Sequence, residues 1–315
     1  MTFVVCGTVC CTGSGQEMPE TPETDSPFFA EHRLFSADAD LYLGQKTRRR
    51  GGSGGRIWGN LYYGGSTLRP QDTPKIQPVF YGFQLGFDAV KSYGGYSTYF
   101  LNVNQSDTKS ALVSNKIENY FFGLGQFYYL RYCHFGYTAA GGYDRYETAA
   151  DGIKGNGDGL QANLFGEFGI DILLGKWALR PYYALQYDFL YHGRIGSSPA
   201  VLYQDWNGHG FEQLMGLRTD WQITNSLTVQ ARATWVRELL SSMPPYYHLR
   251  FSPMQGVQTP AIMFFEGNTG RDWAWLGGGI KLEKEFNIIT YLDYDVLVNT
   301  RHVTHLGSFG VCLNW

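Results

Sequence analysis

Apolar and polar residues alternate in segment after segment of this chain, from residue 56 to its end. The clearest segment is residues 177–192, "WALRPYYALQYDFLYH", in which every odd-numbered position carries an apolar or aromatic side chain. The even-numbered positions include Arg180, Asp188 and His192. Successive side chains of a β-strand point to opposite sides, so a period of two residues predicts a strand with one apolar and one polar face.

Segments of this kind recur between clusters of turn residues. They cover residues 56–64, 78–90, 95–104, 117–130, 133–147, 160–174, 177–192, 210–223, 226–239, 271–285, 286–299 and 302–315. The connections after the first, third, fifth, seventh and ninth segments are long, and those in between are short. Such alternation is typical of barrels with tight turns at one rim and loops at the other. We therefore predict an all-β fold, a closed 12-stranded antiparallel transmembrane β-barrel.

The overall hydropathy of the chain gives no sign of a membrane protein. Mean hydropathy is −0.26, and no run approaches the ~18 apolar residues that a transmembrane helix needs. Strands whose side chains alternate between lipid and lumen escape this test. Charged residues make up only 17% of the chain, against about 25% in soluble domains. The net charge of −3 gives no support to a nucleic-acid partner.

The first 55 residues lack the alternating pattern. They include the acidic, proline-bearing stretch "QEMPETPETDSPFF", a composition typical of linkers. The run "TRRRGGSGG" follows, and we interpret its Arg48, Arg49 and Arg50 as solvated linker, with a processing or lipid-headgroup site as the alternative. We predict a largely unstructured N-terminal linker over residues 1–55 and a barrel over residues 56–315.

No sequence pattern indicates a metal or cofactor. The five cysteines show neither metal-ligand spacing nor a disulfide framework. The stretch "DGIKGNGDG", residues 151–159, lacks the acidic spacing and the terminal Glu of a calcium-binding loop. We interpret it as a flexible extracellular loop, and we expect no cofactor.

Charged residues recur on the polar faces of the predicted strands. We predict that five of them point into the barrel lumen, namely Glu167, Arg180, Asp188, Arg218 and Arg232. Acidic and basic members of this set could pair across the lumen and narrow it, and such buried pairs are costly to break singly.

The last segment ends in "HLGSFGVCLNW", with an apolar residue at every second position. The pattern formed by Ser308, Gly310, Leu313 and Trp315 resembles the C-terminal sorting signal of outer-membrane barrels. The resemblance implies that the barrel-assembly machinery recognises this end of the chain.

Several stretches, in order and spacing, resemble the β-domain of autotransporters, the type V secretion translocators. "RIWGNLYYGG" resembles the first strand of that family, and "YGFQLGFDAV" with "GGYSTYFLNVNQSDTKS" resembles its second and third. "LFGEFGIDILLGKWALRPYYALQY", "GLRTDW", "LTVQARATWVREL" and "AWLGGGIKLEKEFNIITYLDYD" resemble later strands. The resemblance implies a barrel in the bacterial outer membrane, surrounded by lipid, that anchors and exports an N-terminal passenger to the cell surface.

In that family a linker passes through the pore to an upstream passenger. Residues 1–55 hold no passenger, which is expected to belong to an upstream extension of the gene and to be absent from this chain. The one candidate for a pore-spanning helix is "FFAEHRLFSADADLYL", and its apolar residues form no clean helical stripe.

Two other functions deserve comparison. Asp293, Asp295, His302 and His305 on the last hairpin could form a hydrolytic centre at a barrel rim. "HExxH" does not occur in the chain, and polar rim residues are common in barrels, so we predict that the protein is not an enzyme. A narrow pore or an adhesin is the remaining alternative, and single-channel conductance would identify a pore.

Overall fold

The structure of the chain is a computed structural model. It describes residues 55–68, 77–91, 95–109, 113–130, 132–150, 153–193, 195–197, 201–203, 206–241, 246–251, 262–265, 272–284, 288–300 and 302–314. The predicted linker up to residue 54 and the C-terminal Trp315 lie outside these residues.

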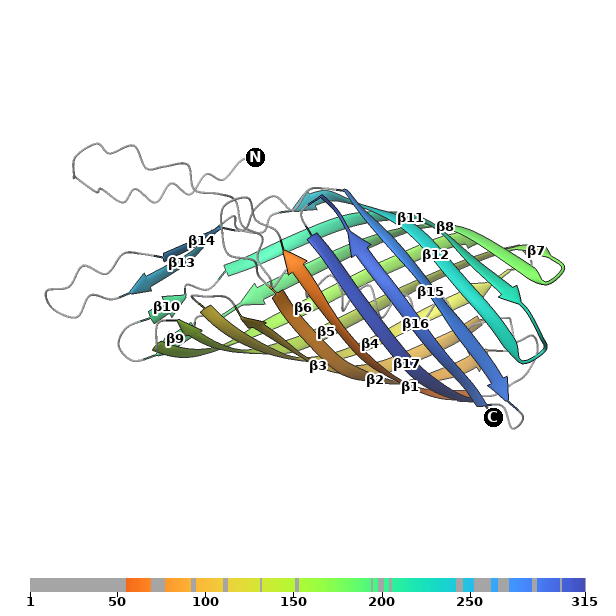
Figure 1. Cartoon of the computed structure of the whole chain (residues 1–315), viewed down its shortest axis with the longest axis horizontal. Helices are drawn as coiled ribbons and strands as arrows, with labels where there is room; N and C mark the ends of the chain where they lie inside the picture. Colours follow the sequence, from red (N-terminus) through yellow and green to blue (C-terminus); the bar gives the residue numbers. More distant parts are fainter. Residues whose placement is uncertain are drawn as a thin grey trace, which may run out of the picture.

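Twelve long strands form one antiparallel barrel, as predicted (Figure 1). They are β1 (Gly55–Leu68), β2 (Gln77–Lys91), β3 (Gly95–Lys109), β4 (Val113–Tyr129), β5 (Cys133–Ala150), β6 (Ile153–Ile170), β8 (Trp177–His192), β11 (Trp206–Gln222), β12 (Leu227–Ser241), β15 (Asp272–Lys284), β16 (Ile288–Val298) and β17 (His302–Asn314). Each pairs with the next in chain order, apart from short strands inserted in three connections.

The barrel closes between its first and last strands. β1 and β17 pair without interruption from Arg56 opposite Asn314 to Leu68 opposite His302. The start of β1 and the end of β17 therefore lie at the same rim of the barrel. We call it the turn rim, because tight turns connect the strands there. The opposite rim is called the loop rim. A closed ring leaves no unpaired sheet edge, which is the condition for strands to lie in lipid.

Two connections predicted to be long loops are instead strand. β3 and β4 pair up to Lys109 opposite Ser114, and β5 and β6 pair up to Ala150 opposite Ile153. The interpretation of residues 151–159 as a flexible loop was therefore wrong from Ile153 onward. Its glycines alternate with polar residues along a strand, and the ring of Tyr146 covers Gly159, where an added Cβ would lie 2.7 Å from the tyrosine hydroxyl. Main-chain pairing with β5 thus overrides the turn-forming composition.

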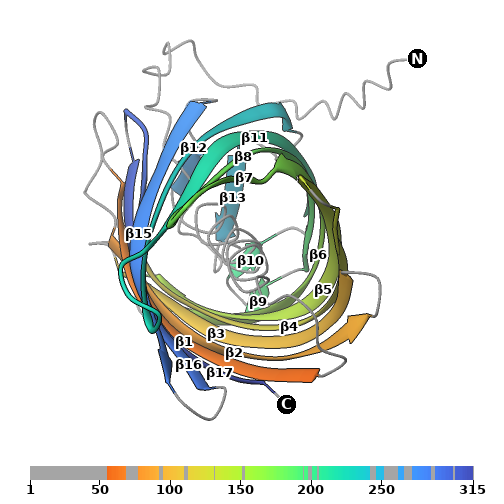
Figure 2. The same cartoon turned by 90° about the vertical axis from the view of Figure 1, so that its right-hand side faces the viewer.

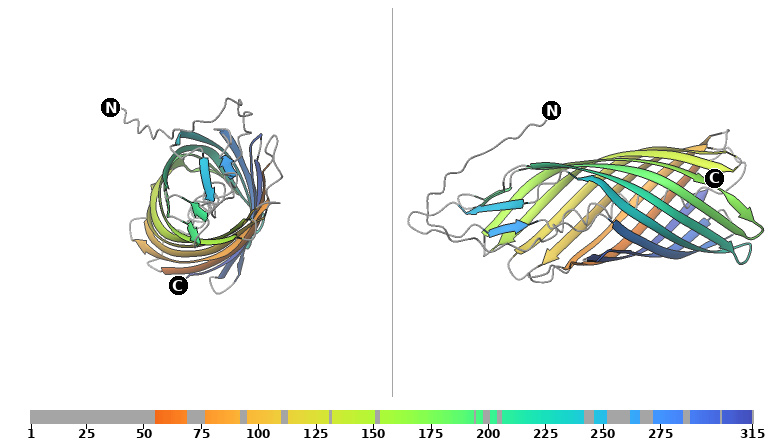
Figure 3. Two further views of the ribbon diagram at one scale, coloured as in Figure 1. Left: turned by 90° about the vertical axis from the view of Figure 1, so that its left-hand side faces the viewer. Right: turned by 90° about the horizontal axis from the view of Figure 1, so that it is seen from above.

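Five short strands complete the fold. β7 (Ile172–Leu174) continues β6 after a break at Asp171 and ends in a tight turn at Gly175, which has a φ of 60°. β9 (Ile195–Ser197), β10 (Val201–Tyr203), β13 (Tyr246–Phe251) and β14 (Ile262–Phe265) lie in the two longest connections. β10 pairs with both β9 and β13, so the two connections join into one small sheet at the loop rim (Figures 1 and 3).

The outer and inner faces of the ring differ in chemistry. Outward side chains are mostly apolar, as at Leu61 and Phe122, both more than half exposed. Inward side chains are mostly polar and are buried, as at Gln84 and Asn102. Viewed along its axis, the barrel is a single ring of strands around a lumen (Figure 2). No helix among the described residues is long and apolar enough to span a membrane.

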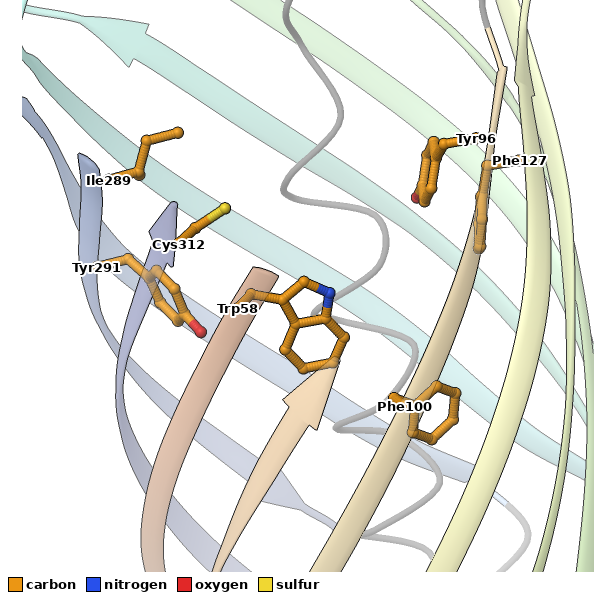
Figure 4. Packing of buried hydrophobic residues seen from close by; sticks show 7 residues of the cluster. All are labelled: Trp58, Tyr96, Phe100, Phe127, Ile289, Tyr291 and Cys312. Carbon is orange, nitrogen blue, oxygen red and sulfur yellow. The ribbon is translucent and has the colours of Figure 1, made fainter. Parts of the chain in front are cut away.

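Aromatic rings and glycines fit together on the inner face. One cluster joins strands β1, β3, β4, β16 and β17 (Figure 4). It contains Trp58, Tyr96, Phe100, Phe127, Ile289, Tyr291 and Cys312. A Cβ added to Gly86 would overlap the Trp58 ring, and one added to Gly123 would overlap Phe100. Glycine at these two positions allows a ring to lie flat across the neighbouring strand, which accounts for part of the chain's high content of both residue types.

Candidate functional site: the barrel lumen

The inner face of the barrel has two walls of different character. The neutral wall consists of the inner faces of β17, β1, β2, β3 and β4. Among the residues that the structure describes, its charged side chains are Arg56 and Asp88, which form an ion pair of 3.1 Å near the turn rim. The charged wall consists of the inner faces of β5, β6, β8, β11, β12, β15 and β16, and carries the remaining buried acids and arginines.

A bidentate ion pair forms the centre of the charged wall. The Arg218 guanidinium donates to both Glu167 oxygens, Nη1 to Oε1 and Nη2 to Oε2, each at 2.7 Å. The Glu167 carboxylate also lies 3.0 Å from Nε2 of His134. The guanidinium stacks over the Tyr182 ring at 3.9 Å from its centroid. Four strands, β5, β6, β8 and β11, are joined by this one group of side chains.

A second chain of contacts continues from it toward β12. Nδ1 of His134 lies 3.4 Å from Asp171, whose other oxygen is 3.2 Å from Nε of Arg180. Arg180 also pairs with Asp220, which accepts a 3.1 Å hydrogen bond from Gln230. Because each charge has a partner of opposite sign, this part of the wall is electrostatically satisfied by its own side chains.

A further ion pair spans β15. Arg232 on β12 donates to both oxygens of Asp295 on β16, and Nε1 of Trp275 donates to the same carboxylate at 3.1 Å. The pair passes over Gly277, where an added Cβ would overlap both Asp295 and Arg232. The absence of a side chain at Gly277 is therefore what lets two strands that are not neighbours form a salt bridge.

Acids in the half of the charged wall nearer the loop rim are held by neutral donors. Asp188 accepts hydrogen bonds from Asn163 at 2.7 Å and Gln186 at 2.9 Å. Asp144 accepts from Tyr146 at 3.0 Å and from Asn119 across the boundary between the walls. Side-chain amides thus stabilise the carboxylates of Asp144 and Asp188.

The five residues singled out from the sequence all have buried side chains on this wall. The exposed fraction is 3% for Asp188, 6% for Glu167, Arg180 and Arg218, and 7% for Arg232. Sequence reasoning did not identify His134 and Asp220 as partners. Their period-two positions place each on the polar face of its strand, but no sequence signal indicates which charges on that face meet.

The structure separates the residues of the proposed hydrolytic rim. Asp293 and Asp295 are buried on the inner face, and Asp295 is bound by Arg232. His305 is exposed on the outer face, where its Nδ1 lies 2.7 Å from the Tyr294 hydroxyl. The side chain of His302 lies outside the described residues. No group of three or more histidine, cysteine or acidic side chains that could hold a metal occurs in the described part of the chain.

The last strand presents two distinct faces near the chain end. Phe309 and Leu313 are exposed on the outer face, at 48% and 46%. Gly310 faces inward, where the Tyr291 side chain crosses it and donates a 3.4 Å hydrogen bond to the carbonyl of Gly59 on β1. A side chain of β16 therefore reaches over β17 to the first strand and bridges the closing seam.

Comparison with known proteins supports one family. The family described as "Autotransporter beta-domain" matches residues 57–295. No curated protein matches the chain.

Solved structures with this fold are remote in sequence. The translocator domain of the autotransporter NalP from Neisseria meningitidis has 14% identity and a TM-score of 0.74, covering 91% of this chain and 96% of its own. The β-domain of the Bordetella autotransporter BrkA has 15% identity and a TM-score of 0.65, with coverage of 84% and 100%. The transport unit of AIDA-I from Escherichia coli has 14% identity and a TM-score of 0.63, with coverage of 90% and 97%.

Proposed function

Because the chain belongs to the autotransporter β-domain family, we propose that it resides in the bacterial outer membrane and translocates a passenger that precedes the barrel. Residues 56–315 are the translocator, and residues 1–55 are the linker that connects it to the passenger. The protein acts as a transport barrel and not as a catalyst.

The observation that carries this proposal is the closed ring with an apolar outside and a polar inside. An apolar outer face has a favourable environment in hydrocarbon, and a ring without edges leaves no main-chain group unpaired there. A polar lumen offers a path for a hydrophilic polypeptide through that hydrocarbon. The tight turns lie at the rim where β1 begins, and in outer-membrane barrels such turns face the periplasm.

The charged wall is proposed to keep the lumen in shape. Its ion pairs join strands that are not neighbours, β6 to β11 and β12 to β16. Contacts of that kind resist flattening of the ring, which hydrogen bonds between adjacent strands do not. Glu167, Arg180, Asp188, Arg218 and Arg232 are therefore lumen-facing residues that hold one side of the pathway rigid.

Assembly is proposed to depend on the C-terminal strand. Ser308, Gly310, Leu313 and Trp315 are the residues that the barrel-assembly machinery would read. The outward exposure of Leu313 supports this role, because a recognition element must be accessible before the barrel is surrounded by lipid.

Surface display of a reporter tests the function. A folded reporter with a signal peptide is fused ahead of residue 1, and intact cells are treated with protease. We expect the reporter to be cleaved from the outside while the barrel keeps the altered gel mobility of a folded barrel. Deletion of residues 302–315 is the matched control, because it removes the strand that closes the ring. A reporter that stays protected beneath a correctly folded barrel would contradict the proposal.

A further inference from the structure

Several buried polar side chains of the neutral wall have no hydrogen-bonding partner within the described part of the chain. The amide groups of Gln84 and Asn104 have no partner at either the nitrogen or the oxygen among the described residues. Oδ1 of Asn60 and the hydroxyls of Thr98 and Ser106 are likewise without one. Gln84, Thr98 and Ser106 are fully buried, and Asn60 and Asn104 are 4% and 3% exposed.

Unmade hydrogen bonds of this kind are unfavourable. A buried donor or acceptor without a partner costs about 1–3 kcal/mol, and native proteins keep few of them. On the charged wall, amides of the same type are used, since Asn163 and Gln186 both donate to Asp188. The amide groups of Gln84 and Asn104 and Oδ1 of Asn60 therefore offer hydrogen-bonding groups that no described side chain uses.

The three amides are contiguous. Asn60 on β1 pairs in register with Gln84 on β2, and Asn104 on β3 pairs with Gly82, two residues from Gln84. Gly82 has no side chain, and an added Cβ there would lie 2.6 Å from the Cβ of Asn104. The patch thus crosses three neighbouring strands, with the Tyr62 hydroxyl lying over Gly82 and donating to Oδ1 of Asn102. We call Asn60, Gln84 and Asn104 the amide patch.

We propose that the amide patch binds the polypeptide segment immediately preceding Gly55, through hydrogen bonds to its peptide groups. The inference rests on the proposed function, which sends that segment through the lumen. It adds the part of the wall that holds the segment and the chemical group that is recognised.

The position of the amide patch and the chemistry of its side chains both favour the segment before Gly55 as its ligand. β1 begins at the turn rim with Gly55, and Asn60 is only five residues further, which is at most about 18 Å along an extended chain. A chain entering the lumen at Gly55 therefore meets this inner face first. A carboxamide carries two donors and an acceptor, which match the N–H and C=O of any peptide group. Because the patch has no charge, it binds acidic and basic segments alike.

Photo-cross-linking tests where the segment lies. A photoreactive amino acid replaces Gln84 or Asn104 in the full chain, and a protease site replaces residues 51–54. After irradiation of the folded barrel, cleavage and boiling, the upstream fragment should remain attached to the barrel. Leu85, which points outward, and Gln230, on the charged wall, are the matched positions and should give little or no adduct. Equal adducts from Leu85, or adducts from Gln230 alone, would overturn the proposal.

Single-channel recording tests what the amides contribute. The double variant Gln84→Leu/Asn104→Leu keeps similar volumes but cannot hydrogen-bond, so the segment should leave the lumen more often. We expect the fraction of time in the conducting level to rise about fivefold or more, the factor expected for loss of one neutral hydrogen bond. Gln213 lies on the outer face of β11, so Gln213→Leu should leave the fraction of time in the conducting level unchanged. Conduction equal to that of the unmodified chain would contradict the inference, provided that gel mobility shows the variant folded.

The two proposals can fail separately. If the chain displays a reporter on the surface but residues 84 and 104 give no cross-link, the role of the amide patch is wrong and translocation stands. If cross-linking succeeds in a chain that never displays a reporter, the patch binds the segment and the translocation function is wrong.

Discussion

Arg218 and Glu167 meet across the intervening strand β8 through two parallel hydrogen bonds of 2.7 Å. Glu167 pairs in register with Ala184 of β8 and Arg218 with Arg180, and the guanidinium lies over the ring of Tyr182 between these two positions. Bidentate pairing of a guanidinium with a carboxylate is among the strongest polar contacts in proteins, and it constrains orientation as well as distance. The pair therefore couples the positions of β6 and β11.

Removing one partner of this pair should destabilise the barrel strongly. Arg218→Leu leaves the buried Glu167 carboxylate without its guanidinium, and breaking a buried pair in this way costs about 3–5 kcal/mol. The measurement is denaturant unfolding of the purified barrel in detergent, followed by gel mobility. The double variant Glu167→Gln/Arg218→Leu should lose less than the sum of the single variants, because it leaves no uncompensated charge.

An exposed pair provides the matched control. Arg237 and Asp272 are 4.0 Å apart, with side chains that are 46% and 55% exposed. Arg237→Leu should change the unfolding free energy by only about 0–1 kcal/mol, since water screens such pairs. A similar loss for Arg218→Leu and Arg237→Leu would mean that the buried pair is not a structural element.

Closure of the ring should be sensitive to Gly310. A Cβ at this position would overlap the hydroxyl of Tyr291, which must then move away from the carbonyl of Gly59 on β1. Gly310→Ala should slow formation of the heat-resistant barrel, measured by the rate at which the fast-migrating gel band appears. Gly307→Ala in the same strand is the control, because its Cβ would have no contact closer than 3.8 Å. Adding Tyr291→Ala should restore the rate, and a failure of that rescue would argue against the steric explanation.

The salt bridge across β15 should depend on Gly277. Gly277→Ala places a Cβ where the Arg232 and Asp295 side chains meet, so it should break their contact and lower barrel stability as much as Arg232→Leu does. Gly166→Ala is the control, since a Cβ there would have no atom within 4 Å. Thermal loss of the folded gel band compares the variants. Equal stability of both glycine variants would show that the pair tolerates displacement.

Recognition of the chain end should require Trp315. Trp315→Asp is expected to reduce the yield of folded barrel in outer-membrane fractions, because the assembly machinery loses the last residue of its signal. The direct penalty of a charge near the membrane interface is only ~0–1 kcal/mol, so instability alone would not explain a large loss. Trp177→Asp tests this point, since Trp177 is exposed at the turn rim, where its ring stacks on Trp221. Equal yields of the two variants would contradict the sorting-signal interpretation.

The sequence alone was sufficient for the strand number, the antiparallel order and the family. Alternation of apolar and polar residues is a local property, because a strand sends successive side chains to opposite faces whatever its neighbours are. That is why the segment 177–192 was delimited correctly at both ends. Segments 105–109 and 153–159 were misinterpreted because the polar residues of the first and the glycines and polar residues of the second favour loops. Only pairing with β4 and β5 makes them strands.

Which side chains contact one another on the two walls was decided by the tertiary structure. A period-two pattern puts Glu167 and Arg218 on polar faces, but their contact depends on the register of three strands and on the Tyr182 ring of β8, over which the guanidinium lies. The same holds for Gln84 and Asn104, which are ordinary polar residues in the sequence but whose amide groups have no hydrogen-bonding partner among the described residues of the ring. Which side chains face inward is a property of each strand, whereas which of them meet is a property of the closed ring, since register and curvature exist only once the strands are paired.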